Sequence, residues 1–93
     1  HEAPDTRAAL LQALAQANMR MERLDNARPL LEEAIRARRL LGQEAIPDLA
    51  LALATLARIE FVTGRHAEAD ALVAEAKALL ARPGIPNSHA RFL

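Results

Sequence analysis

The residues with the widest chemical range in this sequence are its three histidines, since the chain has no cysteine. His66 and Asp70 stand four residues apart, a spacing that places both on one face of a helix, where they can share a hydrogen bond or supply two metal ligands. No third ligand follows at a suitable spacing, and metal sites need three or four. His1 and His89 stand in polar surroundings near the two ends of the sequence. We therefore expect His66 to have a structural role, and we expect no metal site.

The carboxylates offer no acid–base pair. Glu32 and Glu33 are adjacent, so they point in different directions from a helix. The four-residue steps from Arg28 to Glu32 to Arg36 instead predict a ladder of surface ion pairs, each worth about 0.2–0.5 kcal/mol. The sequence also lacks a glycine-rich phosphate loop, a nucleophile elbow and paired zinc-ligand motifs. We expect no catalytic residues, no cofactor and no enzymatic activity in this segment.

Arginines gather most densely at Arg36, Arg38 and Arg39, with Arg28 nearby. Such a cluster can hold a phosphate or an acidic partner, but two glutamates dilute it and no aromatic residue is present to stack on bases. Twelve basic and twelve acidic residues leave no net charge to attract nucleic acid or an anionic membrane. The sequence therefore predicts a solvated helix face, with neither nucleic acid nor membrane as a partner.

The composition indicates closely packed helices. Of the 93 residues, 52% are hydrophobic and only 2% are aromatic, so the core must consist of alanine and leucine. The length suits one small domain or a piece of a longer one. No apolar run approaches the roughly 20 residues that span a bilayer, and no secretory signal is recognisable, so we expect a cytoplasmic protein. The high alanine and arginine content, with Lys77 as the only lysine, is typical of a GC-rich bacterial genome.

Helix-start residues and apolar stripes divide the chain into helices. Proline suits a first helical turn and an acidic residue there favours the helix dipole, so Pro4-Asp5-Thr6 and Pro47-Asp48 each predict a start. Asp25 or Asn26 is expected to cap the second helix, which places Pro29 in its first turn. Apolar residues at three- and four-residue steps predict helices that end near residues 21, 41, 63 and 81. Pro86-Asn87-Ser88 offers one more start signal.

The stretch Leu53–Ala76 repeats an earlier part of the chain. Subtracting 42 from a residue number in this stretch gives the same amino acid at eight positions. The matched pairs are Leu53 and Leu11, Leu56 and Leu14, Ala57 and Ala15, Arg65 and Arg23, Ala69 and Ala27, Leu72 and Leu30, Glu75 and Glu33, and Ala76 and Ala34. Self-similarity at a fixed period predicts an array of helical hairpins.

Two helix–turn–helix units at this 42-residue spacing resemble the tetratricopeptide repeat, in the longer-spaced form of kinesin light chains and many bacterial multidomain proteins. The resemblance rests on Leu11, Leu14, Ala15, Ala27 and Ala34 in the first unit, on Leu53, Leu56, Ala57, Gly64, Arg65, Ala69 and Ala76 in the second, and on the linker residues Leu41-Gly42 and Pro47-Asp48. It implies an all-α fold of two stacked antiparallel hairpins in a right-handed superhelix, with a partial fifth helix. It divides residues 1–93 into repeat one at about 5–41, a linker at 42–46, repeat two at about 47–82 and a partial or capping helix at about 86–93.

The packing of such repeats requires small residues at the helix contacts. Three positions of this chain depart from the family pattern. Alanine is needed where the two helices of a hairpin cross and where the next hairpin docks, since a bulkier side chain there would cost about 1–3 kcal/mol. Glu22 stands where the turn glycine of the family is expected, which predicts a distorted first turn. Asn18 and Glu60 stand where a tyrosine is common.

The resemblance also implies a function. In this family the first helix of each hairpin lines a concave groove, so the predicted function is a protein–protein interaction scaffold in a larger bacterial multidomain protein, with a protein or peptide partner. The groove candidates are Gln12, Gln16, Met19 and Arg20 in the first unit, and Leu51, Ala54, Thr55, Arg58 and Val62 in the second. Two alternatives remain open. One is a structural segment that packs on its own parent or forms a homo-oligomer through an exposed terminal helix face, and the other is a non-catalytic accessory region of a regulatory enzyme or transcription regulator.

Overall fold

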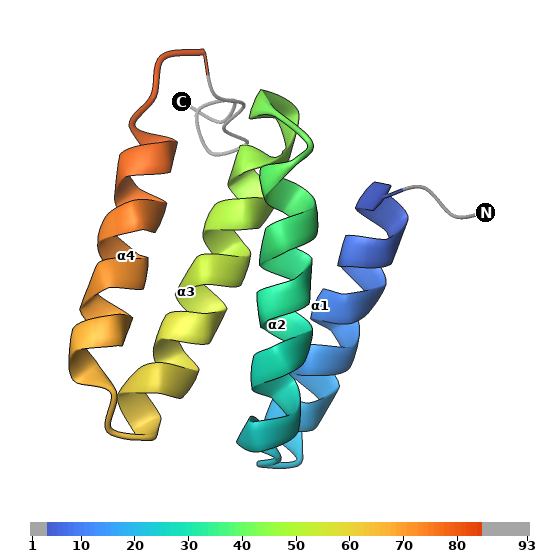
Figure 1. Ribbon diagram of the computed structural model, residues 1–93, viewed down its shortest axis with the longest axis vertical. Coiled ribbons are helices and arrows are strands. Elements are labelled where there is room, and N and C mark those ends of the chain that lie inside the picture. Colours follow the sequence, from blue (N-terminus) through green and yellow to red (C-terminus); the bar gives the residue numbers. More distant parts are fainter. Residues whose placement is uncertain (1–3, 85–93) are drawn as a thin grey trace, which may run out of the picture.

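Four α-helices form two antiparallel hairpins that pack against each other (Figure 1). The computed structural model describes residues 4–84. The helices are α1 (Pro4–Arg20), α2 (Leu24–Arg39), α3 (Ile46–Val62) and α4 (His66–Leu80), and a 3-10 turn covers Gln43–Ala45. Helix α2 packs on α1 within the first hairpin and on α3 of the second. The predicted all-α class is confirmed, whereas the expected partial helix at 86–93 lies outside the described residues.

Helix starts follow the sequence signals in α1 and α3 but not in α2. Asp5 and Asp48 both lie in first turns, where a carboxylate favours the positive end of the helix dipole. Helix α2 begins at Leu24, and its N-cap is Arg23, which makes no side-chain capping bond. The expected cap at residue 25 or 26 is therefore wrong, and Pro29 lies inside the helix, where it leaves one carbonyl without its usual N–H donor. Within residues 4–84, no helix has the length and apolar content needed to cross a membrane.

The alanines that were expected at the helix crossings are all buried. Ala15, Ala27 and Ala34 of the first hairpin are 0% exposed, and the equivalent alanines of the second hairpin are 4–8% exposed. Leu31, Leu53 and Ile59 are the largest side chains that are fully buried. One apolar core thus runs through both hairpins and combines alanines with leucines and isoleucines.

The segment between the hairpins is part of the core. The sequence suggested a plain linker at residues 42–46, but Ala45 is 7% exposed and Ile46 is 4% exposed. Ile46 joins the core cluster and is the first residue of α3. The short 3-10 turn shortens the connection, which holds the end of α2 close to the start of α3.

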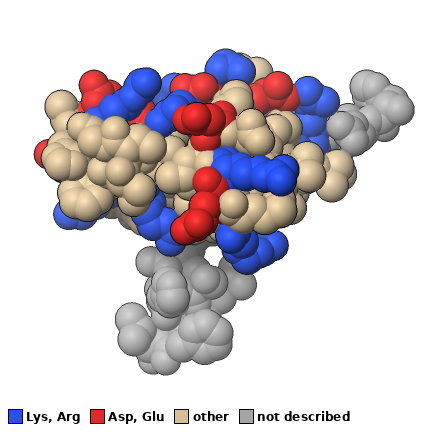
Figure 2. Space-filling view, turned by 90° about the horizontal axis from the view of Figure 1, so that it is seen from below, with Lys and Arg blue, Asp and Glu red and all other residues tan. Residues whose placement is uncertain are grey.

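The two hairpin turns have the same backbone geometry despite their different sequences. Glu22 has φ +60° and Gly64 has φ +88°. The N–H of the next residue donates to a carbonyl five positions back in each turn, from Arg23 to Asn18 at 2.8 Å and from Arg65 to Glu60 at 2.7 Å. These are the bonds of a Schellman helix end, so the expected distortion of the first turn is wrong. Both turns lie at one end of the molecule, and Figure 2 shows that end, where charges of both signs surround an uncharged area on the α4 side.

Replacing Glu22 by glycine is expected to stabilise the fold. A non-glycine residue in the left-handed region costs about 1–2 kcal/mol, and part of this is offset by the larger unfolded-state freedom of glycine. Glu22→Gly should therefore raise the free energy of unfolding by about 0.5–1 kcal/mol, measured by urea denaturation. Gly64→Ala is the matched control and should lower stability by a similar amount. A loss of stability in Glu22→Gly would contradict the equivalence of the two turns.

The outer face of α1, which carries Leu10 and Leu14, is more exposed than the equivalent face of α3. Leu14 was expected to pack between repeats, yet it is 53% exposed, and Leu10 is 52% exposed. Their equivalents 42 residues later, Leu56 and Ala52, are 7% and 0% exposed, because α2 covers that face of α3. Helix α1 has no such neighbour among residues 4–84.

Candidate partner-binding groove

A surface hollow of about 330 Å³ opens between α1 and α3, near the end that carries the hairpin turns. It is lined by Gln16, Met19, Arg20, Glu22, Leu24, Arg58, Ile59 and Val62. Its volume lies at the lower limit of about 300–1,000 Å³ for small-molecule pockets. The space suits one or two side chains of a partner better than a cofactor.

The hollow has an apolar floor and charged edges. Ile59 is 0% exposed and belongs to the core, while Met19 and Leu24 are partly buried and pack against that core. Arg20 and Arg58 are both exposed, and neither makes an ion pair with another residue of the described region. Two guanidinium groups against the single carboxylate of Glu22 leave the edges with a net positive charge. Such an arrangement favours a group that combines an apolar surface with a carboxylate.

The structure brings together five of the nine groove candidates. Gln16, Met19, Arg20, Arg58 and Val62 all line the hollow. Leu51 and Ala54 are exposed on α3 but do not line it.

Two further groove candidates make contacts inside the chain. Thr55 is 7% exposed, and its hydroxyl donates to the carbonyl of Leu51 at 2.9 Å. Gln12 accepts a hydrogen bond from Nε of Arg38. Thr55 is therefore buried in an internal contact, whereas Gln12 is half-buried and its place in a groove stays a prediction. Glu22 and Leu24 were missed because the turn and the second helix were not expected to contribute, and Ile59 of α3 was missed because it belongs to the buried core.

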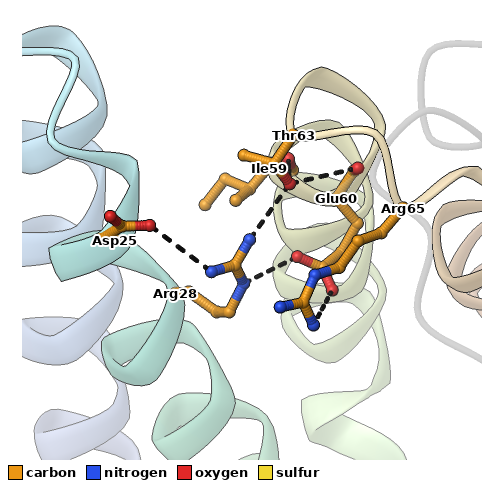
Figure 3. Close-up of polar contacts among 6 residues, drawn as sticks. All are labelled: Asp25, Arg28, Ile59, Glu60, Thr63 and Arg65. Carbon is orange, nitrogen blue, oxygen red and sulfur yellow. Dashed lines mark hydrogen bonds and ion pairs between the residues drawn. The ribbon is translucent and has the colours of Figure 1, made fainter.

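Arg28 and Glu60 fix the position of α3 against α2 beside this hollow (Figure 3). Nε of Arg28 donates to Oε1 of Glu60 at 2.7 Å, and the two side chains are 17% and 8% exposed. Arg28 also donates to the hydroxyl of Thr63 at 3.1 Å and lies 3.7 Å from a carboxylate oxygen of Asp25. Nη1 of Arg65 lies 3.8 Å from the other oxygen of Glu60. The cluster ties α2 to the end of α3 and to the turn that follows, and Glu60 lies two residues from the groove arginine Arg58.

Two further arginines of α2, Arg38 and Arg39, also reach across the junction between the hairpins. Arg38 is 7% exposed, and Nη1 lies 3.5 Å from Oδ2 of Asp48 in α3. Nη2 of Arg39 donates to both oxygens of Glu75 in α4, at 2.9 and 2.8 Å. The expected solvated basic face is therefore wrong for Arg28 and Arg38, whereas Arg39 pairs with Glu75 and stays half exposed. The ion-pair ladder through Glu32 is also wrong, because Arg28 points to α3 and Glu32 makes no ion pair within residues 4–84.

Among residues 4–84, His66 and Asp70 do not form the pair that their spacing allowed, while His1 and His89 lie outside the described residues. The ring of His66 stacks on Phe61 with centroids 4.7 Å apart, and no hydrogen bond joins it to Asp70. Glu33 pairs with Arg7 of α1. In the described part of the chain, no group of three or more His, Asp or Glu side chains is placed to hold a metal ion.

Comparison with protein-family models, with curated protein sequences and with solved structures found no match. The functional argument therefore depends on the geometry of the hollow and on the internal repeat.

Proposed function

We propose that this chain is a protein–protein interaction module that binds a peptide segment of its partner in the hollow between α1 and α3. The 42-residue repeat, the equivalent turns and the alanines at the crossings support a stack of the tetratricopeptide kind. In such a stack the first helix of each hairpin faces the partner. The hollow is built from both first helices, which is the placement this proposal requires.

The observation that carries the proposal is the pair of exposed arginines, Arg20 and Arg58, beside an apolar floor. Most other arginines in the four helices form ion pairs with a glutamate or an aspartate, as Arg28, Arg38 and Arg39 do. Arg20 and Arg58 remain able to form charge-assisted hydrogen bonds with an incoming carboxylate. A partner segment with an acidic residue beside an aliphatic one satisfies both parts of the hollow.

Peptide selection tests this assignment. A random peptide library selected on the wild-type chain should yield acidic-aliphatic sequences, and Arg58→Glu should weaken binding of the selected peptides by about tenfold or more, as expected for the loss of a charge-assisted contact. Arg36→Glu is the matched control, because Arg36 is exposed on α2 away from the hollow. Fluorescence anisotropy measures both affinities. Equal affinity of wild type and Arg58→Glu would place the peptide site elsewhere, and wild-type stability of both variants in thermal melts excludes unfolding as the cause.

A further inference from the structure

The internal repeat identifies what would cover the outer face of α1. In the second hairpin the corresponding face of α3 is covered by α2, which contributes Leu31 and Ile35 to the common core. The equivalents of these two residues in α4 are Val73 and Lys77, and Val73 is 38% exposed. Leu80, in the last turn of α4, is 50% exposed. By the repeat, the face of α4 that carries Val73 corresponds to the face of α2 that covers α3, and we refer to it as the outer face of α4.

We infer that the outer face of α4 in one copy of this chain stacks on the outer face of α1 in a second copy, head to tail, as α2 stacks on α3 within one chain. The stacked residues on α1 are Leu10 and Leu14, whose counterparts are buried in the second hairpin. The stacking places Val73 of one copy against this leucine face of the next. The apolar area removed from water at Leu10 and Leu14 drives the contact.

The polar residues that replace the internal Arg28–Glu60 pair at the two outer faces can still hydrogen-bond in this arrangement. Inside the chain, position 28 is arginine and meets Glu60. The equivalents at the two outer faces are Asp70 and Asn18, so the arginine–glutamate pair is replaced by a carboxylate and an amide that can hydrogen-bond.

A head-to-tail contact does not close on itself after two copies, so it generates open-ended assemblies. Sedimentation velocity of the full 93-residue chain should show species that grow beyond the dimer as concentration rises. Leu14→Glu should weaken this association by about tenfold or more, since a buried carboxylate replaces an apolar contact. Leu40→Glu is the control, because Leu40 is 86% exposed and lies outside both faces. A monomer at every concentration, or equal effects of the two substitutions, would overturn the inference.

Site-specific cross-linking distinguishes head-to-tail stacking from a face that pairs with its own copy. The chain has no cysteine, so single variants give unique attachment points. A mixture of Asn18→Cys and Asp70→Cys should form a mixed dimer with a short bismaleimide linker, identified by its mass, in clear excess over either homodimer. The pair Leu40→Cys and Asp70→Cys supplies the background. Dominant homodimers of Asn18→Cys would overturn the inference in favour of pairing between two α1 faces, and a yield no higher than background would overturn it altogether.

The inference and the proposed peptide function fail separately. Loss of peptide binding in Arg58→Glu leaves the cross-linking result unchanged, because Arg58 lines the hollow and not either outer face. Loss of cross-linking in the Leu14→Glu background leaves peptide binding unchanged for the same reason.

Discussion

Replacing Arg28 by methionine is expected to lower the free energy of unfolding by about 3 kcal/mol, because removing one partner of a buried ion pair leaves the other uncompensated. Glu60 is the partner left behind, and its side chain is only 8% exposed. Its remaining cation, Arg65, lies 3.8 Å away and is itself 57% exposed. Urea denaturation monitored by circular dichroism measures the change. An exposed pair would lose only about 0–1 kcal/mol in the same experiment.

A double variant separates the charge from the packing. Arg28→Met combined with Glu60→Leu removes both charges and fills the space with apolar atoms, so it should recover most of the lost stability. Arg36→Met is the control for arginine loss, since Arg36 is exposed and makes no ion pair with another residue of the 4–84 region. If Arg28→Met alone costs no more than Arg36→Met, the junction between the hairpins does not depend on this pair. If the double variant is as unstable as the single ones, the loss reflects packing and not charge.

The Arg28–Glu60 pair also shows why the sequence could not predict how the arginines of α2 are used. Local spacing favours the partner four residues away, and Glu32 stands at that position. In the folded chain Arg28 finds Glu60, 32 residues further along, because α3 packs on the same face of α2. Only the packing of one hairpin on the other determines which cation is buried. The sequence therefore predicts a solvated surface for this cluster of arginines. In the structure, three of them link the two hairpins.

The helices and their crossings, by contrast, could be predicted because they depend on short-range patterns. Stripes of alanine and leucine with Gly42 and Gly64 as breaks give four helices, and the 42-residue repeat gives the two hairpins. The start of α2 was misjudged because Arg23 occupies the cap position without a capping side chain, so no local signal marks it. The lining of the hollow could be predicted in part. Gln16 and Arg58 follow from their positions in the first helices, whereas the contribution of Leu24 depends on how the turn folds.

The final prediction concerns two alanines that are equivalent in the repeat. Ala27 and Ala69 are equivalent residues of α2 and α4, and they are 0% and 4% exposed, as expected if each helix crosses its hairpin partner there. Leucine at either position inserts three carbon atoms where two helix axes are in close contact, and overpacking of this kind costs about 1–3 kcal/mol. We expect a loss near the upper end, about 2–3 kcal/mol, for both Ala27→Leu and Ala69→Leu, because a helix backbone has little room to shift.

The matched control for this substitution is Ala74→Leu, which places the same side chain on an exposed position of α4 and should change stability by less than about 0.5 kcal/mol. Thermal and urea unfolding of the three variants measures the difference. Equal and large losses at residues 27 and 69, with none at 74, follow if the two hairpins use the same crossing geometry. A loss at Ala27 without one at Ala69 would mean that the second hairpin accommodates a larger side chain, and the two units would then be similar in sequence without being equivalent in packing.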